Sequence, residues 1–314
     1  MITAISVVKN SADVIESMVR GNAVVADNFV VLDNGSTDRT LEILEMLQGE
    51  GFQIEVLHDD DPQHKLQERY LFLVHYAVEQ YNADWVMPVD DDEIICTNSD
   101  EIAPEEIKGC IESLEQDDLY YVNWRNYIPS EEDDPNEVCV MSRQSFCFDD
   151  EPEMTTKVII PAKLVDDSFT IAYGCHYADS DRIRNRVRLN QLRLAHYPVR
   201  SAEQIASKAL VGWLNNLTMP NRKTGLNYHW EIMYDEVKNG GLPSVDQMQM
   251  MCTLYRQYPN DTDHLNIIRK PICLPEKCFE NRYTDLNEIN LIRNLCDNAE
   301  VIAKKYAEMS NKQV

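Results

Sequence analysis

The chain has 314 residues, of which 44% are apolar, and it carries a formal net charge of -25. This length accommodates one large α/β domain or two small ones. The acidic charge argues against general nucleic-acid affinity and against a basic membrane-binding face. No apolar run approaches the roughly 20 residues that a transmembrane segment needs, and the N-terminus predicts a strand instead of a signal peptide. The nine cysteines are scattered, without a Cys-x-x-Cys pair, so we expect reduced thiols in a cytoplasmic protein, at most peripheral to the inner face of the membrane.

The first hundred residues alternate strands and helices. Apolar, β-branched runs predict strands, and apolar residues at helical spacing predict helices between them. The expected strands are 2–8, 29–32, 54–57 and 84–89, and the expected helices are 12–20, one ending near residue 47, and 70–81. This order predicts a mostly parallel, Rossmann-like sheet flanked by helices. Ligands bind such sheets at the carboxyl ends of the strands, where Lys9-Asn10, Asp33 and Asp90–Asp92 lie.

The second half is predicted to be richer in strands and less regular. Ser201-Ala-Glu-Gln204 is a capping-box signature that opens a helix to about Asn215. The other expected elements are strands at 119–128, 138–148, 157–164, 168–175 and 189–197, and helices around 226–238, from Ser244 and over roughly 285–309.

The fourth strand ends in four consecutive acids, Asp90-Asp91-Asp92-Glu93. Carboxylates crowded at one strand end repel each other and are costly to hold near an apolar core. A divalent cation is the compensation that we favour, and hard oxygen ligands suit Mg²⁺, Mn²⁺ or Ca²⁺ better than Zn²⁺. The alternative is a solvated acidic loop.

Three segments in the N-terminal half, Ile5–Asn10, Phe29–Thr40 and Trp85–Glu93, carry a family resemblance. In order and separation they resemble the family 2 glycosyltransferases of GT-A fold. Two later segments, Lys157–Pro161 and His196–Ser201, resemble an uncharacterised bacterial subgroup. The resemblance implies a GT-A catalytic domain over 1–215, with a nucleotide-binding half (1–100) and an acceptor half (101–215). A C-terminal helical extension over 216–314 follows.

The resemblance also implies a reaction in polysaccharide biosynthesis. The donor would be a nucleotide-diphospho-sugar, the acceptor a glycan or a lipid-linked molecule, and the cofactor Mn²⁺ or Mg²⁺, with inversion at the anomeric carbon the usual outcome. The family's nucleobase-binding aspartate matches Asp33, and its Asp-x-Asp motif matches Asp90-Asp91-Asp92, whose first acid faces the ribose and whose last acid binds the metal. The implied nucleotide-sugar contacts also include Val8, Lys9, Asn10 and Arg69.

Several further residues are candidates for the site. His196 at a strand end is the favoured third metal ligand beside Asp92 and Asp90, and packing beside Tyr197 is the alternative; His176 is the competing histidine and a candidate sugar contact. Lys157 either reaches the diphosphate or balances a nearby acidic loop at the surface. For Lys208, a solvated helix face is favoured over a position facing the phosphates. An acid should act as the base; the positions that qualify are Asp149, Asp150, Glu151, Asp179 and Asp181, of which Asp150 and Asp179 are retained.

An alternating row of arginines, Arg182, Arg184, Arg186 and Arg188, would share one face of an extended segment. Pairing with the protein's own acids is favoured over binding an anionic acceptor. For Trp213, Trp230 and Tyr228, core packing is favoured over sugar stacking.

Two other classes of function stay open at this stage. One is an inactive, transferase-like protein that binds divalent cations or polysaccharide. The other is a sugar nucleotidyltransferase, which would normally carry a Gly-rich loop where this chain has Lys9–Asp13.

Overall fold

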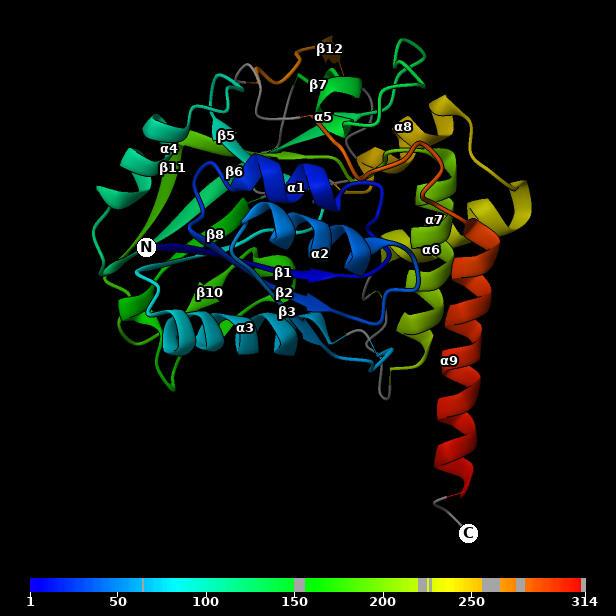
Figure 1. Cartoon of the computed structure of the whole chain (residues 1–314), viewed down its shortest axis with the longest axis horizontal. Helices are drawn as coiled ribbons and strands as arrows, with labels where there is room; N and C mark the ends of the chain where they lie inside the picture. Colours follow the sequence, from blue (N-terminus) through cyan, green and yellow to red (C-terminus); the bar gives the residue numbers. More distant parts are fainter. Residues whose placement is uncertain are drawn as a thin grey trace.

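The computed structural model describes residues 1–63, 65–149, 156–219, 225, 228–255, 266–274 and 280–311. Its centre is a ten-stranded sheet flanked by helices (Figure 1). The N-terminal part of the sheet is parallel, as expected, in the order β3-β2-β1-β4. These strands are β1 (Ile2–Val8), β2 (Asn28–Asp33), β3 (Ile54–His58) and β4 (Trp85–Pro88).

Both faces of this parallel region are covered by helices. Alternate residues of β1 point to opposite faces: Ile2 and Ala4 pack with α1 (Ile15–Asn22) and α2 (Thr40–Glu50), whereas Ile5 packs with α3 (Leu66–Tyr81). Burial on both faces explains the continuous apolar runs that predict these strands. Because these strands are parallel, the loops that follow them lie at one edge of the sheet, the carboxyl edge.

The second half of the sheet is largely antiparallel. From β4 the order continues through β8 (Thr156–Pro161), β6 (Asp118–Ile128), β7 (Phe146–Phe148) and β12 (Ile267–Arg269). Strand β11 (Asn185–His196) pairs with β6 and with β5 (Glu93–Thr97), while β9 (Thr170–Ile171) and β10 (Ala178–Asp179) form a separate pair. Along the chain, α4 (Pro104–Glu112) connects β5 to β6, and α5 (Val140–Arg143) lies between β6 and β7.

The remaining helices stand at one side of the sheet (Figure 1). Ser201 caps α6 by accepting a 3.1 Å hydrogen bond from the Gln204 backbone N–H. The helices at this side of the sheet are α6 (Ala202–Leu217), α7 (Tyr228–Gly240), α8 (Val245–Thr253) and α9 (Leu291–Asn311). Region 216–314 also adds β12 to the sheet. In the described part of the chain, no helix is long and apolar enough to cross a membrane.

Some expected elements differ in the structure. Segment 138–148 is not one strand: consecutive residues Cys139, Val140 and Met141 enter the same apolar cluster, which a helical turn permits and an alternating strand does not. The strand expected at 168–175 stops at Ile171, because Gly174 (φ 63°) and Cys175 (φ 56°) have left-handed backbones. Strand β8 ends at Pro161 instead of residue 164, and α9 begins at Leu291 instead of near residue 285.

Candidate active site

A cavity of about 530 Å³ opens at the carboxyl ends of β1 and β4 and extends to the C-terminal helices. Its lining includes nine of the residues that the sequence singled out as site candidates. These are Val8, Lys9, Asn10, Arg69, Asp90, Asp91, Asp92, His176 and His196.

The loop after β1 is shaped by Asn10, which has a left-handed backbone (φ 54°). Asparagine adopts this conformation at lower cost than most residues. The Asn10 side-chain oxygen accepts a 2.8 Å hydrogen bond from the Thr37 backbone N–H, and the Asn10 backbone N–H donates to Ser36 Oγ at 2.9 Å. The loops after β1 and β2 are thereby held together beside the cavity.

Asp33 does not reach the cavity. Its carboxylate is 2% exposed and accepts hydrogen bonds from the backbone N–H groups of Gly35 and Ser36, at 3.1 and 3.2 Å. It therefore braces its own turn, and the direct nucleobase contact expected for it does not fit this arrangement. The next residue, Asn34, lines the cavity instead.

The first acid of the cluster, Asp90, has both oxygens engaged. Tyr70 donates to Oδ1 at 2.5 Å, and the Lys157 ammonium lies 2.5 Å from Oδ2. Lys157 is 1% exposed and also contacts Glu93 at 2.8 Å. The surface interpretation of Lys157 was therefore wrong, and Lys157 is not among the residues that line the cavity. Burial, together with the Asp90 charge, raises the pKa of Glu93 to about 8 despite this cation.

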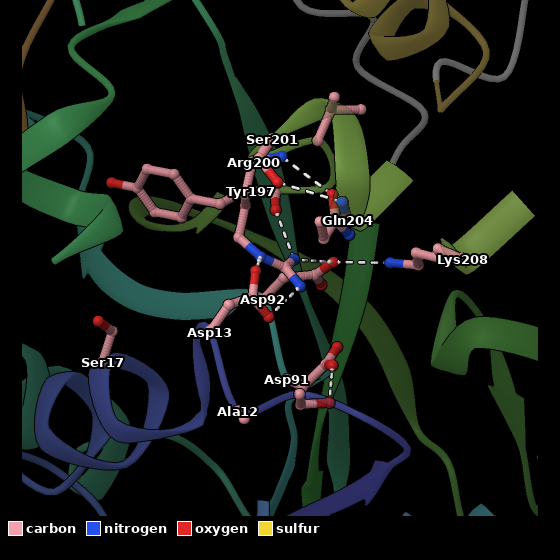
Figure 2. A network of polar contacts seen from close by, with 12 residues as sticks. Ala12, Asp13, Ser17, Asp91, Asp92, Tyr197, Arg200, Ser201, Gln204 and Lys208 are labelled. Carbon is pink, nitrogen blue, oxygen red and sulfur yellow. Dashed lines mark hydrogen bonds and ion pairs between the residues drawn. The ribbon is translucent and has the colours of Figure 1, made fainter. Parts of the chain in front are cut away.

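Asp92 is the most strongly compensated acid of the cluster (Figure 2). Lys208 Nζ lies 2.9 Å from its Oδ2, and Arg200 Nη1 donates to the same oxygen at 3.4 Å. Burial opposes ionisation of Asp92, but the charges of Lys208 and Arg200 outweigh it and hold its pKa well below the usual value. Arg200 also donates two hydrogen bonds to Asp13, at 2.7 and 3.1 Å, which ties the loop after β1 to the start of α6. The expectation that Lys208 lies on a solvated helix face was wrong.

His196 faces the other oxygen of Asp92. Its Nε2 lies 3.5 Å from Asp92 Oδ1, and its Nδ1 is 2.6 Å from Asn126 Oδ1. An amide oxygen can only accept, so Nδ1 carries a proton; burial lowers the pKa of His196 and favours the neutral ring. A lone pair at Nε2 then faces a carboxylate oxygen.

This pair of acceptors fits a divalent cation, because a cation between Nε2 and Oδ1 would satisfy both. Within the described residues, no three His, Cys, Asp or Glu side chains form a metal site alone. Mg²⁺ is commonly held by one or two carboxylates plus substrate phosphates, so the donor set fits a metal that binds together with a diphosphate. Asp90, expected as a further ligand, is instead engaged by Tyr70 and Lys157.

The middle acid, Asp91, accepts a hydrogen bond from Ser11 Oγ. Burial and the neighbouring Asp92 charge raise the pKa of Asp91 to about 6. The three aspartates therefore have three different environments, although their sequence is a simple repeat.

His176 has a separate anchor. Its Nδ1 donates to the Thr156 carbonyl at 2.7 Å, and burial lowers its pKa. The Trp124 ring contacts both histidines, with centroids 4.9 Å from His176 and 4.2 Å from His196. The structure thus places both histidines at the cavity but pairs only His196 with Asp92.

The helical side of the cavity is aromatic and was largely missed from the sequence. Gly212 lies in the middle of α6, where a Cβ atom would be 2.1 Å from the Trp230 ring. Glycine costs about 1 kcal/mol in a helix interior relative to alanine, and here it makes room for Trp230. The helical spacing of Gln204, Lys208, Val211 and Asn215, which places them on one face of α6, could have indicated this wall from the sequence. Outside α6, the lining residues that the sequence did not indicate include Trp124, Tyr173 and Tyr255. From α6 the lining includes Gln204, Lys208, Val211, Gly212 and Asn215. Tyr228 and Trp230, for which core packing was favoured, also line the cavity.

The two retained base candidates differ. Asp179 is 58% exposed, pairs with Arg186 at 2.5 Å and is not among the cavity residues. Asp150 lies outside the described residues. Pairing of the arginine row with the protein's own acids is confirmed for Arg182 with Asp166 and for Arg186 with Asp179.

A parallel sheet with an aspartate cluster and a cavity at its carboxyl edge agrees with a glycosyltransferase. The model of the family described as glycosyl transferase family 2 matches residues 3–161, just over half of the chain, and the chain belongs to this family. No curated protein matches it in sequence.

Three solved structures show limited similarity to this chain. TarS (residues 1–349) of S. aureus in complex with UDP is 14% identical, with a TM-score of 0.42 over 76% of this chain and 72% of that one. Glucosyl-3-phosphoglycerate synthase from Mycobacterium tuberculosis, in complex with Mn²⁺, UDP and phosphoglyceric acid, is 14% identical, with a TM-score of 0.37 over 70% and 80%. GalNAc-T7 with UDP, GalNAc and Mn²⁺ is 12% identical, with a TM-score of 0.39 over 77% and 58%.

Proposed function

We propose that this protein transfers a sugar from a nucleotide-diphospho-sugar to a glycan or lipid-linked acceptor, with inversion at the anomeric carbon and with Mn²⁺ or Mg²⁺ as cofactor. The observation that carries the proposal is the division of one cavity into two chemically different sides. The sheet side bears the aspartate cluster, whereas the helical side bears aromatic rings together with Lys208 of α6, which reaches Asp92. Two such sides suit the two substrates of a transfer reaction.

The sheet side suits the nucleotide diphosphate. Lys9, Asn10, Asn34 and Arg69 surround its nucleotide end. Burial lowers the pKa of Lys9, but the nearby Asp33 opposes this shift. No Walker-type glycine loop occurs in the sequence, so side chains and a metal must hold the phosphates.

Asp92 Oδ1 and His196 Nε2 are the protein ligands that we assign to the metal. When bound, the metal would stabilise the negative charge that develops on the departing nucleoside diphosphate. Lys208 and Arg200 lie at the other oxygen of Asp92, so two further cations stand beside the same region. They keep Asp92 ionised and hold its carboxylate in one orientation.

The aromatic side suits a carbohydrate acceptor. Tyr228 and Trp230 line it, and the apolar faces of a pyranose ring can pack on such rings. Gly212 supports this assignment because it makes room for the indole of Trp230.

Inversion requires a base on the acceptor side, opposite the leaving group. The exposed, ion-paired position of Asp179 does not support it in this role. Asp150 remains the candidate on sequence grounds. We expect Asp150→Asn to lose transfer while keeping donor affinity, and Asp179→Asn to retain both.

The setting of the reaction is also a proposal. All cysteines within the described residues are free thiols, which agrees with a cytoplasmic protein. A lipid-linked acceptor would bring the reaction to the inner face of the membrane.

The decisive experiment measures thermal stabilisation by nucleoside diphosphates and nucleotide-sugars, with and without Mn²⁺. A ligand at 100 times its dissociation constant should stabilise the protein by about 2.7 kcal/mol. The best donor is then incubated alone and with oligosaccharides, and the released nucleotide and the anomeric product are followed by NMR. Metal-dependent release of a nucleoside diphosphate supports the proposal. Binding without turnover would indicate a binding protein, and pyrophosphate formation from a nucleoside triphosphate and a sugar phosphate would indicate a nucleotidyltransferase.

A further inference from the structure

The segment 280–311 forms a C-terminal arm that contacts α1, the cavity and α6 in turn. Glu16 of α1 is fully buried and accepts hydrogen bonds from the backbone N–H groups of Arg282, Tyr283 and Thr284, at 2.7, 2.9 and 2.9 Å. Ile289, further along the arm, lines the cavity. The arm is therefore anchored at its start and contributes directly to the cavity wall.

Helix α9 continues the arm along α6 (Figure 1). Asn294 is buried and donates a 3.0 Å hydrogen bond to Ser207 Oγ of α6. Later in the same helix, Lys305 forms an ion pair with Asp61, which lies in the loop between β3 and α3. The helix thus joins the wall of the cavity to a loop that is more than 240 residues away in sequence.

Asp61 and Asp59 together hold two cavity side chains, and Asp59 accepts from Asn34 Nδ2 at 2.6 Å and from Arg69 Nε at 2.7 Å. The Asp61 backbone carbonyl accepts hydrogen bonds from the same two side chains, from Asn34 Nδ2 at 2.9 Å and from Arg69 Nη2 at 2.6 Å. Both Asn34 and Arg69 line the nucleotide end of the cavity. The Asp61 carboxylate forms an ion pair with Lys305 and a second one with Lys65, the latter at 2.7 Å.

We infer that Lys305 is a positioning residue for the nucleotide: it fixes Asp61, and through the Asp61 carbonyl it fixes Asn34 and Arg69 at the cavity wall. This inference rests on the proposed function, because it takes the cavity to bind a nucleoside diphosphate. Lys305 itself is not among the cavity residues, so its effect is on affinity for the nucleotide and not on the chemical step.

The expected effect is modest, because the Lys305 and Asp61 side chains are 36% and 22% exposed. Exposed ion pairs are weak, so loss of the pair should weaken binding by about threefold to fivefold. Reversing the charge turns attraction into repulsion and should weaken binding by about tenfold. The fold should be retained, because α9 keeps its other contacts with α6.

The test uses the full chain and the nucleoside diphosphate that the wild-type protein binds best in the presence of Mn²⁺, with affinity measured by calorimetry. Lys305→Glu should raise the dissociation constant by about tenfold, and Lys305→Arg should restore it to within about twofold of wild type. Lys304→Glu is the matched control, because Lys304 is the adjacent lysine, is 75% exposed and pairs only within its helix with Glu300 among the contacts described. It should leave affinity unchanged.

A double variant tests whether the effect passes through Asp61. In an Asp61→Asn background, Lys305→Glu should cause no additional loss, because no carboxylate remains to repel. In the transfer reaction, Lys305→Glu should raise KM for the donor and leave kcat unchanged. Equal affinity of Lys305→Glu and Lys304→Glu, or a full additional loss in the Asp61→Asn background, would overturn the inference while leaving the proposed function intact. A wild-type protein that binds no nucleoside diphosphate would overturn the proposed function and this inference with it.

Discussion

Lys157 Nζ lies 2.5 Å from Asp90 Oδ2 and 2.8 Å from Glu93 Oε2. One fully enclosed ammonium therefore contacts two acids of the cluster: it balances the charge of Asp90, whereas burial raises the pKa of Glu93 to about 8 and favours its protonated form at neutral pH. Lys208 and Arg200 compensate Asp92. The charge of this cluster is thus offset largely by the chain's own cations. What stays open to a metal is the single gap between Asp92 and His196.

Replacement of Lys157 tests this balance. Lys157→Met keeps most of the side-chain volume but leaves Asp90 and Glu93 without their cation. We expect the free energy of unfolding to fall by about 3–5 kcal/mol, as for other broken buried ion pairs. Urea denaturation at neutral pH measures the change. Lys163→Met is the control, because its pair with Asp117 is 60% and 41% exposed and should be worth less than about 1 kcal/mol. Equal losses in both variants would contradict the buried pairing.

The sequence predicted the parallel half of the sheet well, because strands buried on both faces are continuous apolar runs. It also predicted that the loops after β1, β2 and β4 converge. It did not predict that Asn34 lines the cavity next to Asp33, since neighbouring residues in a turn point in different directions and the backbone hydrogen bonds of Asp33 are visible only in the fold.

The acceptor side was harder to predict because its residues come from separate helices. In the sequence, Trp230 resembles an ordinary core residue, and its close contact with Gly212 of another helix is evident only in the fold. Lys157 and Lys208 could not be assigned either, because their partners lie 64 and 116 residues away. Local periodicity carries no information about such contacts.

The metal assignment predicts different outcomes for the two histidines. His196→Ala should weaken Mn²⁺-dependent nucleotide binding by at least tenfold, as expected for loss of a metal ligand or its close partner. His176→Ala is the matched control and should leave the Mn²⁺ dependence intact, because its Nδ1 bonds to Thr156 and it is His196 that faces Asp92. Calorimetric titration with and without Mn²⁺ measures both. The reverse pattern would mean that His176 is the ligand.

Asp92→Asn should abolish both metal-dependent nucleotide binding and transfer. It should also lower the stability of the metal-free protein, by roughly 3 kcal/mol, because Lys208 and Arg200 lose their shared carboxylate. Circular dichroism during urea denaturation checks the second effect. A variant that retains full activity would exclude Asp92 as a metal ligand.

Gly212→Ala tests the acceptor side without touching the acid cluster. Alanine favours a helix by about 1 kcal/mol over glycine, but its Cβ atom would lie 2.1 Å from the Trp230 ring and force that ring to move. We expect transfer to the acceptor to fall by at least tenfold, while donor hydrolysis and nucleotide affinity stay near wild type. Gly109→Ala in α4 is the control, since nothing lies within 4 Å of its added Cβ. Parallel loss of donor hydrolysis would argue that Trp230 serves the donor instead.

The dependence of stability on pH can be predicted at Glu50. Arg20 donates two hydrogen bonds to its carboxylate, both at 2.8 Å, and Tyr283 donates a third at 2.5 Å. The Arg20 and Tyr283 hydrogen bonds lower the pKa of Glu50 to about 2. Because the folded pKa lies below the unfolded value of about 4.3, this pair stabilises the fold fully above that value, and the stabilisation is lost as the pH falls toward 2.

Glu50→Gln should therefore be less stable than wild type by about 1–2 kcal/mol at pH 6, a value discounted because the Glu50 side chain is partly exposed. The difference should shrink steadily below about pH 4.3, as the wild-type carboxylate gains its proton. Urea denaturation of both proteins from pH 3 to pH 7 measures it. Glu45→Gln, on the exposed face of the same helix, should show no comparable difference at any pH. A Glu50→Gln deficit that stays constant down to pH 3 would show that the loss comes from packing and not from the ionised pair.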